Sequence, residues 1–104
     1  MKFGIFYELQ LPRPLQAGGD LKLYQAPPTQ PGTAARCGCD HAGGADHRFL
    51  EGISHPPSPE SFLAAASQRT RNIRLGHGIF QLTTNHPARV AERVAVLDLL
   101  SNGR

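Results

Sequence analysis

Several features are scarce in this chain of 104 residues, and each scarcity excludes a class of protein. The two cysteines, Cys37 and Cys39, are too close together to form the disulfide framework of a small secreted domain. No apolar run is long enough to span a bilayer. The N-terminal MKFGIFYE has one basic residue and lacks the pattern of a signal peptide. We therefore expect a cytoplasmic protein that does not enter a membrane.

A concentrated positive patch is also lacking. Lys and Arg outnumber Asp and Glu by 11 to 8, which gives a formal net charge of +3. The basic residues are scattered along the chain and do not alternate with aromatic residues, as they do in many nucleic-acid interfaces. A solvated surface is the simpler explanation, and we expect no nucleic-acid partner.

One long segment lacks core-forming residues. Residues 26–46 include no Val, Ile, Leu, Met or aromatic side chain, and Pro27, Pro28 and Pro31 oppose a helix there. A compact domain rarely has about twenty such residues between two strongly apolar elements. We predict that residues 26–46 are irregular, or that the sequence has been altered in this segment.

The same region contains residues of the types that bind metals. The candidates are Cys37, Cys39, Asp40, His41, Asp46 and His47. These side chains suit zinc, but the Cys-x-Cys spacing is not the usual one and no second pair of ligands follows. We therefore predict no metal site.

Elsewhere the apolar residues form two patterns that are typical of strands. The nearly unbroken run at residues 2–8 suits a strand that is buried on both faces. Residues 73–82 have β-favouring side chains, interrupted by Gly76 and Gly78. A glycine within a strand marks either a bulge needed for packing or a close approach of the backbone to a ligand. The residues themselves leave both explanations open.

One helix is predicted before the second strand and another after it. One begins at Pro59, directly after a serine that can act as its N-cap, and runs to about residue 70. The other begins at Pro87, has apolar residues at helical spacing and ends at Asn102–Gly103. His86 is more simply the N-cap of this helix than a ligand contact. Alternating strands and helices predict an α/β fold with parallel strands and right-handed crossover helices.

Longer motifs resemble one known family. They are the opening MKFGIFYE with the Leu-Pro-Arg-Pro that follows, PESFLAA at residues 59–65, and LGHG, NHPAR and LDLLSNGR between residues 75 and 104. In this order they resemble the N-terminal part of the bacterial luciferase-like monooxygenases, whose members are flavin-dependent barrels of roughly three times this length. The resemblance implies that residues 1–104 are a partial barrel domain, an N-terminal fragment of a (β/α)8 TIM barrel. Where the family has a helix and an apolar strand, residues 26–46 keep the length but not the apolar character, which suggests two compensating reading-frame shifts.

The resemblance also implies an activity and its cofactor. Members of the family use reduced FMN, supplied by a separate flavin reductase, and molecular oxygen to oxidise a small organic substrate such as an aldehyde. A deazaflavin in place of FMN is a variant of the same implication. In the family the flavin ring lies across the carboxyl ends of the strands, against a strained peptide near the end of the third strand. The matching positions are Gly78 and Ile79, and we expect Gly76, Gly78 and Ile79 to contact the cofactor.

A catalytic base is implied at one further position. A histidine in a Glu-His-His-Phe motif acts as a base at the end of the second strand of the family. The corresponding residues here are Asp46-His47-Arg48-Phe49, so His47 matches the first histidine of the motif. Imidazole titrates near neutral pH and therefore suits proton transfer. The alternative is that His47 is a solvated histidine in a loop.

A second hypothesis is a truncated, catalytically inactive barrel fragment. Three βα units alone would leave sheet edges and an apolar helix face uncovered. Such a chain would aggregate, form a homo-oligomer or associate with a complementary partner.

Overall fold

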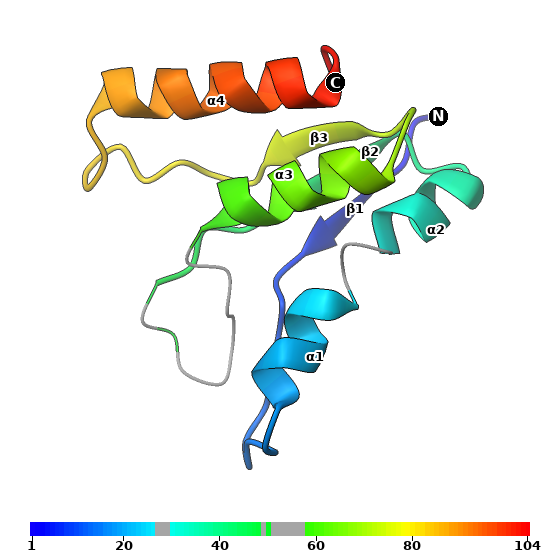
Figure 1. Cartoon of the computed structure of the whole chain (residues 1–104), viewed down its shortest axis with the longest axis vertical. Helices are drawn as coiled ribbons and strands as arrows, with labels where there is room; N and C mark the ends of the chain where they lie inside the picture. Colours follow the sequence, from blue (N-terminus) through cyan, green and yellow to red (C-terminus); the bar gives the residue numbers. More distant parts are fainter. Residues whose placement is uncertain (27–29, 49, 51–57) are drawn as a thin grey trace.

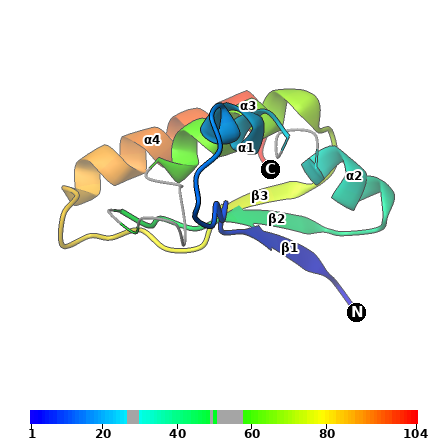
Figure 2. The ribbon, with the colours of Figure 1, turned by 90° about the horizontal axis from the view of Figure 1, so that it is seen from below.

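The computed structural model describes residues 1–26, 30–48, 50 and 58–104, and its centre is a three-stranded parallel sheet (Figure 1). The strands are β1 (Gly4–Tyr7), β2 (His41–Gly44) and β3 (Arg74–His77), and they lie in this order across the sheet. The helices are α1 (Gly19–Gln25), α2 (Gln30–Arg36), α3 (Pro59–Arg69) and α4 (Pro87–Ser101). Figure 2 shows α1, α3 and α4 on one side of the sheet, and no described helix lies on the other.

The core lies between the sheet and α3. Leu63 and Ile73 are fully buried there, and the ring of Tyr7 packs edge-on against Phe62 with the ring centroids 5.4 Å apart. Gly44 brings the middle strand so near α3 that a Cβ at this position would already lie 3.6 Å from the ring of Phe62. The small side chains of β2 therefore let α3 pack directly onto the sheet.

The prediction that residues 26–46 are irregular is wrong, because α2 and β2 both lie in this segment. Pro31 stands in the first turn of α2, where its missing N–H is not needed. The chain leaves α2 through Gly38 (φ 87°), whose N–H donates to the carbonyl of Ala35, a bond typical of a helix C-terminus. β2 needs no large side chain, because its backbone pairs with β1 on one side and with β3 on the other.

β1 is shorter and more exposed than the sequence predicted. It covers Gly4–Tyr7, within the expected residues 2–8, and Phe6 is 53% exposed. The expectation of burial on both faces is wrong for the described chain, since β1 is an edge strand and the described helices cover one face only.

β3 likewise ends at His77, although the sequence predicted a strand over residues 73–82. Its partner β2 ends at Gly44, whose carbonyl accepts a last hydrogen bond from the N–H of Gly78 at 2.7 Å. Without a further strand beside it the chain turns, and the N–H of Leu82 donates to the carbonyl of Phe80. The extent of β3 is therefore set by its partner and not by its own side chains.

The two predicted helices are confirmed at nearly the expected residues. α4 begins at Pro87, and the Nδ1 atom of His86 accepts a hydrogen bond from the N–H of Ala88 at 3.2 Å, so His86 is an N-cap. The helix ends at Ser101, and its C-cap Asn102 has a left-handed φ of 59°. α3 begins at Pro59, but the hydroxyl of Ser58 does not bond to the helix backbone.

One interaction that fixes α4 on the sheet was not predicted. The side chain of Arg104 donates to the carbonyls of Ser101 (2.6 Å), Ile73 (3.0 Å), Ser67 (3.0 Å) and Thr70 (3.1 Å), and to the hydroxyl of Thr70 (3.0 Å). The carbonyls of Ser67, Thr70 and Ser101 lie at the C-terminal ends of α3 and α4, where helix dipoles favour a positive charge, and that of Ile73 directly precedes β3. Arg104 thus joins both helices to the start of β3.

Candidate functional site

The carboxyl ends of the three strands lie side by side and form the candidate site. The last paired row of the sheet consists of Tyr7, Gly44 and His77. His47 follows β2 by three residues, and Gly78 and Ile79 follow β3 directly. In open and closed parallel sheets, ligands bind at this edge, because the connecting loops meet there. The structure therefore brings His47, Gly78 and Ile79 to one edge of the sheet.

A row of glycines lies next to this edge, on the face without described helices. Phe6, Gly43 and Gly76 are partners in one row across the three strands. The ring of Phe6 lies over its neighbours: a Cβ on Gly43 would be 3.1 Å from it, and a Cβ on Gly78 would overlap it. At Gly76 a Cβ would meet no atom within 4 Å. The sheet therefore offers a flat, open area of backbone beside an aromatic ring.

Gly78 and Ile79 combine close packing with exposure. Gly78 has no space for a side chain under the ring of Phe6, whereas the side chain of Ile79 is 55% exposed. Arg13–Pro14 is the one cis peptide bond among the described residues, so the bond between Gly78 and Ile79 is trans. Gly78 is thus needed for packing, whereas Gly76 leaves backbone accessible, and the approach of a ligand to it stays a prediction.

His47 is half-buried, and its Nδ1 atom is buried without a hydrogen-bond partner among the described residues. The neighbouring Asp46 is 2% exposed and pairs with Arg48, with 3.1 Å between Oδ1 and Nε. That hydrogen bond raises the pKa of Arg48. The carboxylate next to His47 is thus engaged by an arginine, and the imidazole keeps a free nitrogen.

His77 is a residue of this edge that the sequence reading missed. Its ring stacks on Phe80 with 4.0 Å between the centroids, and its Nε2 atom is buried without a hydrogen-bond partner in the described chain. Burial lowers the pKa of His77. The charges of Glu60 and Asp46 oppose this shift, while that of Arg93 adds to it. A histidine between two glycines at a strand end is the signal that could have identified it.

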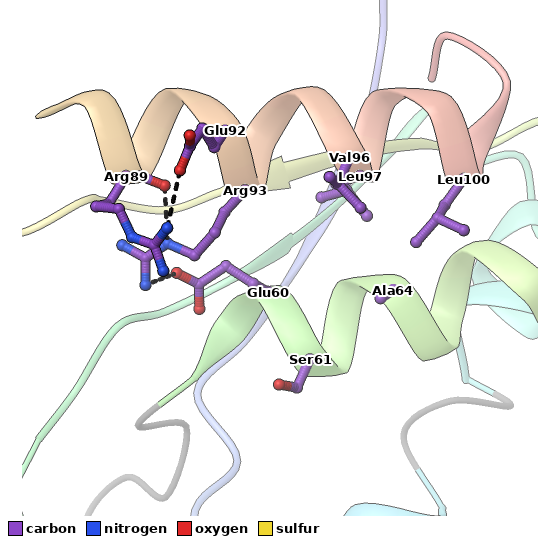
Figure 3. Close-up of a pocket in the computed structure, with 9 residues that line it drawn as sticks. All are labelled: Glu60, Ser61, Ala64, Arg89, Glu92, Arg93, Val96, Leu97 and Leu100. Carbon is purple, nitrogen blue, oxygen red and sulfur yellow. Dashed lines mark hydrogen bonds and ion pairs between the residues drawn. The ribbon is translucent and has the colours of Figure 1, made fainter.

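A separate groove of about 360 Å³ lies between α3 and α4 (Figure 3). Its charged residues form two ion pairs, Arg93 with Glu60 and Arg89 with Glu92, both at 3.1 Å. The groove lies between two helices and not at the strand ends, so it is not part of the candidate site.

The residues considered as metal ligands do not come together. Among the described residues, no three Cys, His, Asp or Glu side chains are grouped so that they could hold a metal ion, and Cys37 and Cys39 are free thiols. In the same part of the chain, no helix has the length and apolar character needed to cross a bilayer.

Comparison with known proteins gives consistent matches. A sequence profile of the family described as luciferase-like monooxygenase matches residues 1–104. Limonene 1,2-monooxygenase of Rhodococcus erythropolis is 51% identical over 53 residues, which are 51% of this chain and 14% of that protein. 4-Hydroxyprotoasukamycin monooxygenase of Streptomyces nodosus subsp. asukaensis is 53% identical over 47 residues, which are 45% of this chain and 13% of that protein.

Solved structures match over the whole chain. Monooxygenase RslO1 from Streptomyces bottropensis has a TM-score of 0.85 and 34% identity, over 100% of this chain and 31% of its own. The oxygenating constituent of 3,6-diketocamphane monooxygenase of Pseudomonas putida, a type II Baeyer–Villiger enzyme in complex with FMN, has a TM-score of 0.84. It is 23% identical over 99% of this chain and 27% of its own, so it shows the fold alone. The chain spans less than a third of each relative, and the predicted fold class, part of a barrel with parallel strands, is confirmed.

Proposed function

Because this chain belongs to the luciferase-like monooxygenase family, we propose that it acts in a flavin-dependent oxidation of a small organic molecule by molecular oxygen. The observation that carries the proposal is the open glycine row beside the carboxyl ends of the strands. A flat ring can lie against backbone only where side chains are absent, and Gly76 meets this requirement.

The residues at the edge suit a reduced FMN cofactor. In this proposal Gly76, Gly78 and Ile79 hold its ring system, with the exposed side chain of Ile79 and the ring of Phe6 as apolar neighbours. When bound, reduced FMN supplies the electrons that molecular oxygen needs in order to oxidise the substrate. The apolar neighbours exclude water from the reacting atoms, which strengthens electrostatic interactions there.

His47 is the proposed proton-transferring group. Its side chain is half-buried, and its buried Nδ1 atom has no hydrogen-bond partner among the described residues, so a ring nitrogen is left unpaired beside the strand ends. A neutral imidazole accepts a proton from a substrate group within hydrogen-bond distance, and the charged form returns it. The Asp46–Arg48 pair holds the backbone on both sides of His47.

The proposal includes a separate flavin reductase as partner, as the resemblance implies, and the cytoplasm as location. The names of two relatives, limonene 1,2-monooxygenase and 4-hydroxyprotoasukamycin monooxygenase, suggest an organic substrate. A deazaflavin in place of FMN fits the same glycine row, since its ring system is equally flat.

One observation favours a second candidate, an inactive barrel fragment. Phe6 and Ile79 are more than half exposed, and one face of the sheet has no described helix on it. Exposed apolar groups and open strand edges favour association over catalysis.

Thermal unfolding in the presence of FMN tests the two candidates. A ligand that binds only the folded form stabilises it by about 2.7 kcal/mol at 100 times its dissociation constant. We expect the melting temperature to rise with the concentration of FMN, reduced or oxidised, while riboflavin of matched concentration controls for the phosphate. A chain that aggregates and melts at the same temperature with and without FMN would contradict the flavin enzyme and favour the fragment.

A further inference from the structure

The β3–α4 loop, residues 78–86, begins at the candidate site and ends at the first residue before α4. It folds back on the carbonyl of Gln81, which accepts hydrogen bonds from the N–H of Thr84 (3.2 Å) and from the side-chain amide of Asn85 (3.0 Å). At its start, Phe80 stacks on the ring of His77. The loop is therefore an ordered turn whose first two residues, Gly78 and Ile79, are the proposed cofactor contacts.

One side chain joins this loop to both neighbouring helices. In Arg93 the Nη2 atom donates to Oδ1 of Asn85 at 2.8 Å, and Nε donates to the carbonyl of Arg89 at 3.3 Å. Its Nη1 atom lies 3.1 Å from Oε1 of Glu60 in the first turn of α3. Figure 3 shows Arg93 and Glu60 reaching toward each other across the space between α3 and α4.

The geometry of these contacts requires a guanidinium group. Each of the three acceptors is reached by a different nitrogen of the same planar group, which a lysine ammonium on a flexible stem cannot reproduce. The carboxylate of Glu60 is 15% exposed and the side chain of Arg93 39% exposed, so water screens this pair only in part. Arg93 thus connects the loop after β3 with the helix that follows β2.

We propose that Arg93 is a positioning residue that, through Asn85, holds the β3–α4 loop in the shape that binds the flavin. The proposal rests on the proposed function, because the loop carries two of the cofactor contacts. Arg93 itself lies on α4, and its effect on the site passes through Asn85 and the turn at Gln81.

Two measurements on the same variants test the proposal. Hydrogen exchange of the peptide covering residues 78–86 reports the order of the loop without any ligand. Equilibrium dialysis against FMN kept reduced under argon reports binding. The variants are Arg93→Gln, Arg93→Lys, Asn85→Ala and the double variant Arg93→Gln/Asn85→Ala. Arg89→Gln is the matched control, because Arg89 lies one turn away on α4 and pairs with Glu92 in solvent.

We expect faster exchange in the loop and roughly tenfold weaker FMN binding in Arg93→Gln and in Asn85→Ala, with the double variant no weaker than either. Arg93→Lys should resemble Arg93→Gln, and Arg89→Gln should resemble the unaltered chain. Unchanged exchange in Arg93→Gln overturns the proposal, as do additive effects in the double variant or full rescue by lysine. If exchange rises and FMN binding is unchanged, the positioning role is wrong. If the unaltered chain itself binds no FMN, the proposed function fails and this role fails with it.

Discussion

At the scale of single residues, the two glycines of the strand-end motif differ in what surrounds them. A Cβ on Gly76 would enter open space, whereas a Cβ on Gly78 would overlap the ring of Phe6 and lie 3.2 Å from the carbonyl of Gly44. The sequence shows the same residue type at both positions, so it could not separate a packing glycine from an accessible one. The neighbours that enclose Gly78, Phe6 of β1 and Gly44 of β2, lie far from it in the chain, so no local sequence pattern shows them.

This difference makes Gly76→Ala and Gly78→Ala a matched pair. Gly78→Ala should destabilise the fold by about 1–3 kcal/mol, because the ring of Phe6 must move. Gly76→Ala should leave stability within about 0.5 kcal/mol of the original value, yet weaken FMN binding if the flavin lies against this backbone. Urea unfolding and FMN dialysis measure the two quantities. Unchanged FMN affinity in Gly76→Ala would remove Gly76 from the proposed site.

Because His77 is partly buried, we expect the stability of the fold to depend on pH. Its pKa in the folded chain is lowered by burial below the ordinary value of 6.5. At a pH above 6.5, His77 is neutral in both the folded and the unfolded chain, and its full contribution to the free energy of unfolding is present. As the pH falls through 6.5, the unfolded chain binds a proton that the folded chain does not yet bind, so stability decreases. Urea unfolding at several pH values between about 7.5 and 5.5 should show a smaller decrease in His77→Asn than in the unaltered chain. His41→Asn, at an exposed position, is the control, and equal slopes in all three chains would contradict the prediction.

At the scale of elements, helices with local end signals were predicted well, whereas β1 and β3 were predicted too long and β2 was not predicted. The signals for the start and the end of α4 are pairs of adjacent residues, His86-Pro87 and Asn102-Gly103, and both predictions are confirmed. β2 reads His-Ala-Gly-Gly, which has no strand propensity, and it forms because both neighbours supply backbone partners. The reading-frame explanation of residues 26–46 concerns the coding DNA and stays a prediction, which translating that DNA in all three frames would test.

The junction of α3, β3 and α4 depends on Arg104, which local sequence patterns could not reveal. Its side chain bonds to carbonyls 31 to 37 residues away. Arg104→Gln should lower the free energy of unfolding by about 2–4 kcal/mol, since hydrogen bonds from a charged donor are lost and carbonyls at two helix ends keep no partner there. Arg71→Gln, in the exposed turn between α3 and β3, removes the same charge and serves as control. Thermal and urea unfolding measure both, and equal stability of the two variants would show that the network contributes little.

At the scale of the whole molecule, the arrangement of layers predicts self-association. The described helices lie on one face of the sheet, and Phe6 on the other face is 53% exposed beside backbone without side chains (Figure 2). This chain matches less than a third of the length of the solved relatives. The rest of each relative is additional chain that does not align with these 104 residues. An uncovered face with an edge strand next to it favours contact with a second sheet.

Sedimentation of the 104-residue chain at rising concentration tests this prediction. We expect the unaltered chain to associate. Phe6→Lys should weaken this association about tenfold or more, because an unpaired charge in the contact must be desolvated at a cost of several kcal/mol. Leu99→Lys makes the same change of charge at a side chain that is 81% exposed on α4, in the opposite layer, and should leave association unchanged. If Leu99→Lys has the larger effect, the helix layer and not the open face of the sheet carries the contact. If the unaltered chain is monomeric at every concentration, the ring of Phe6 over Gly43 and Gly78 is sufficient to cover the face by itself.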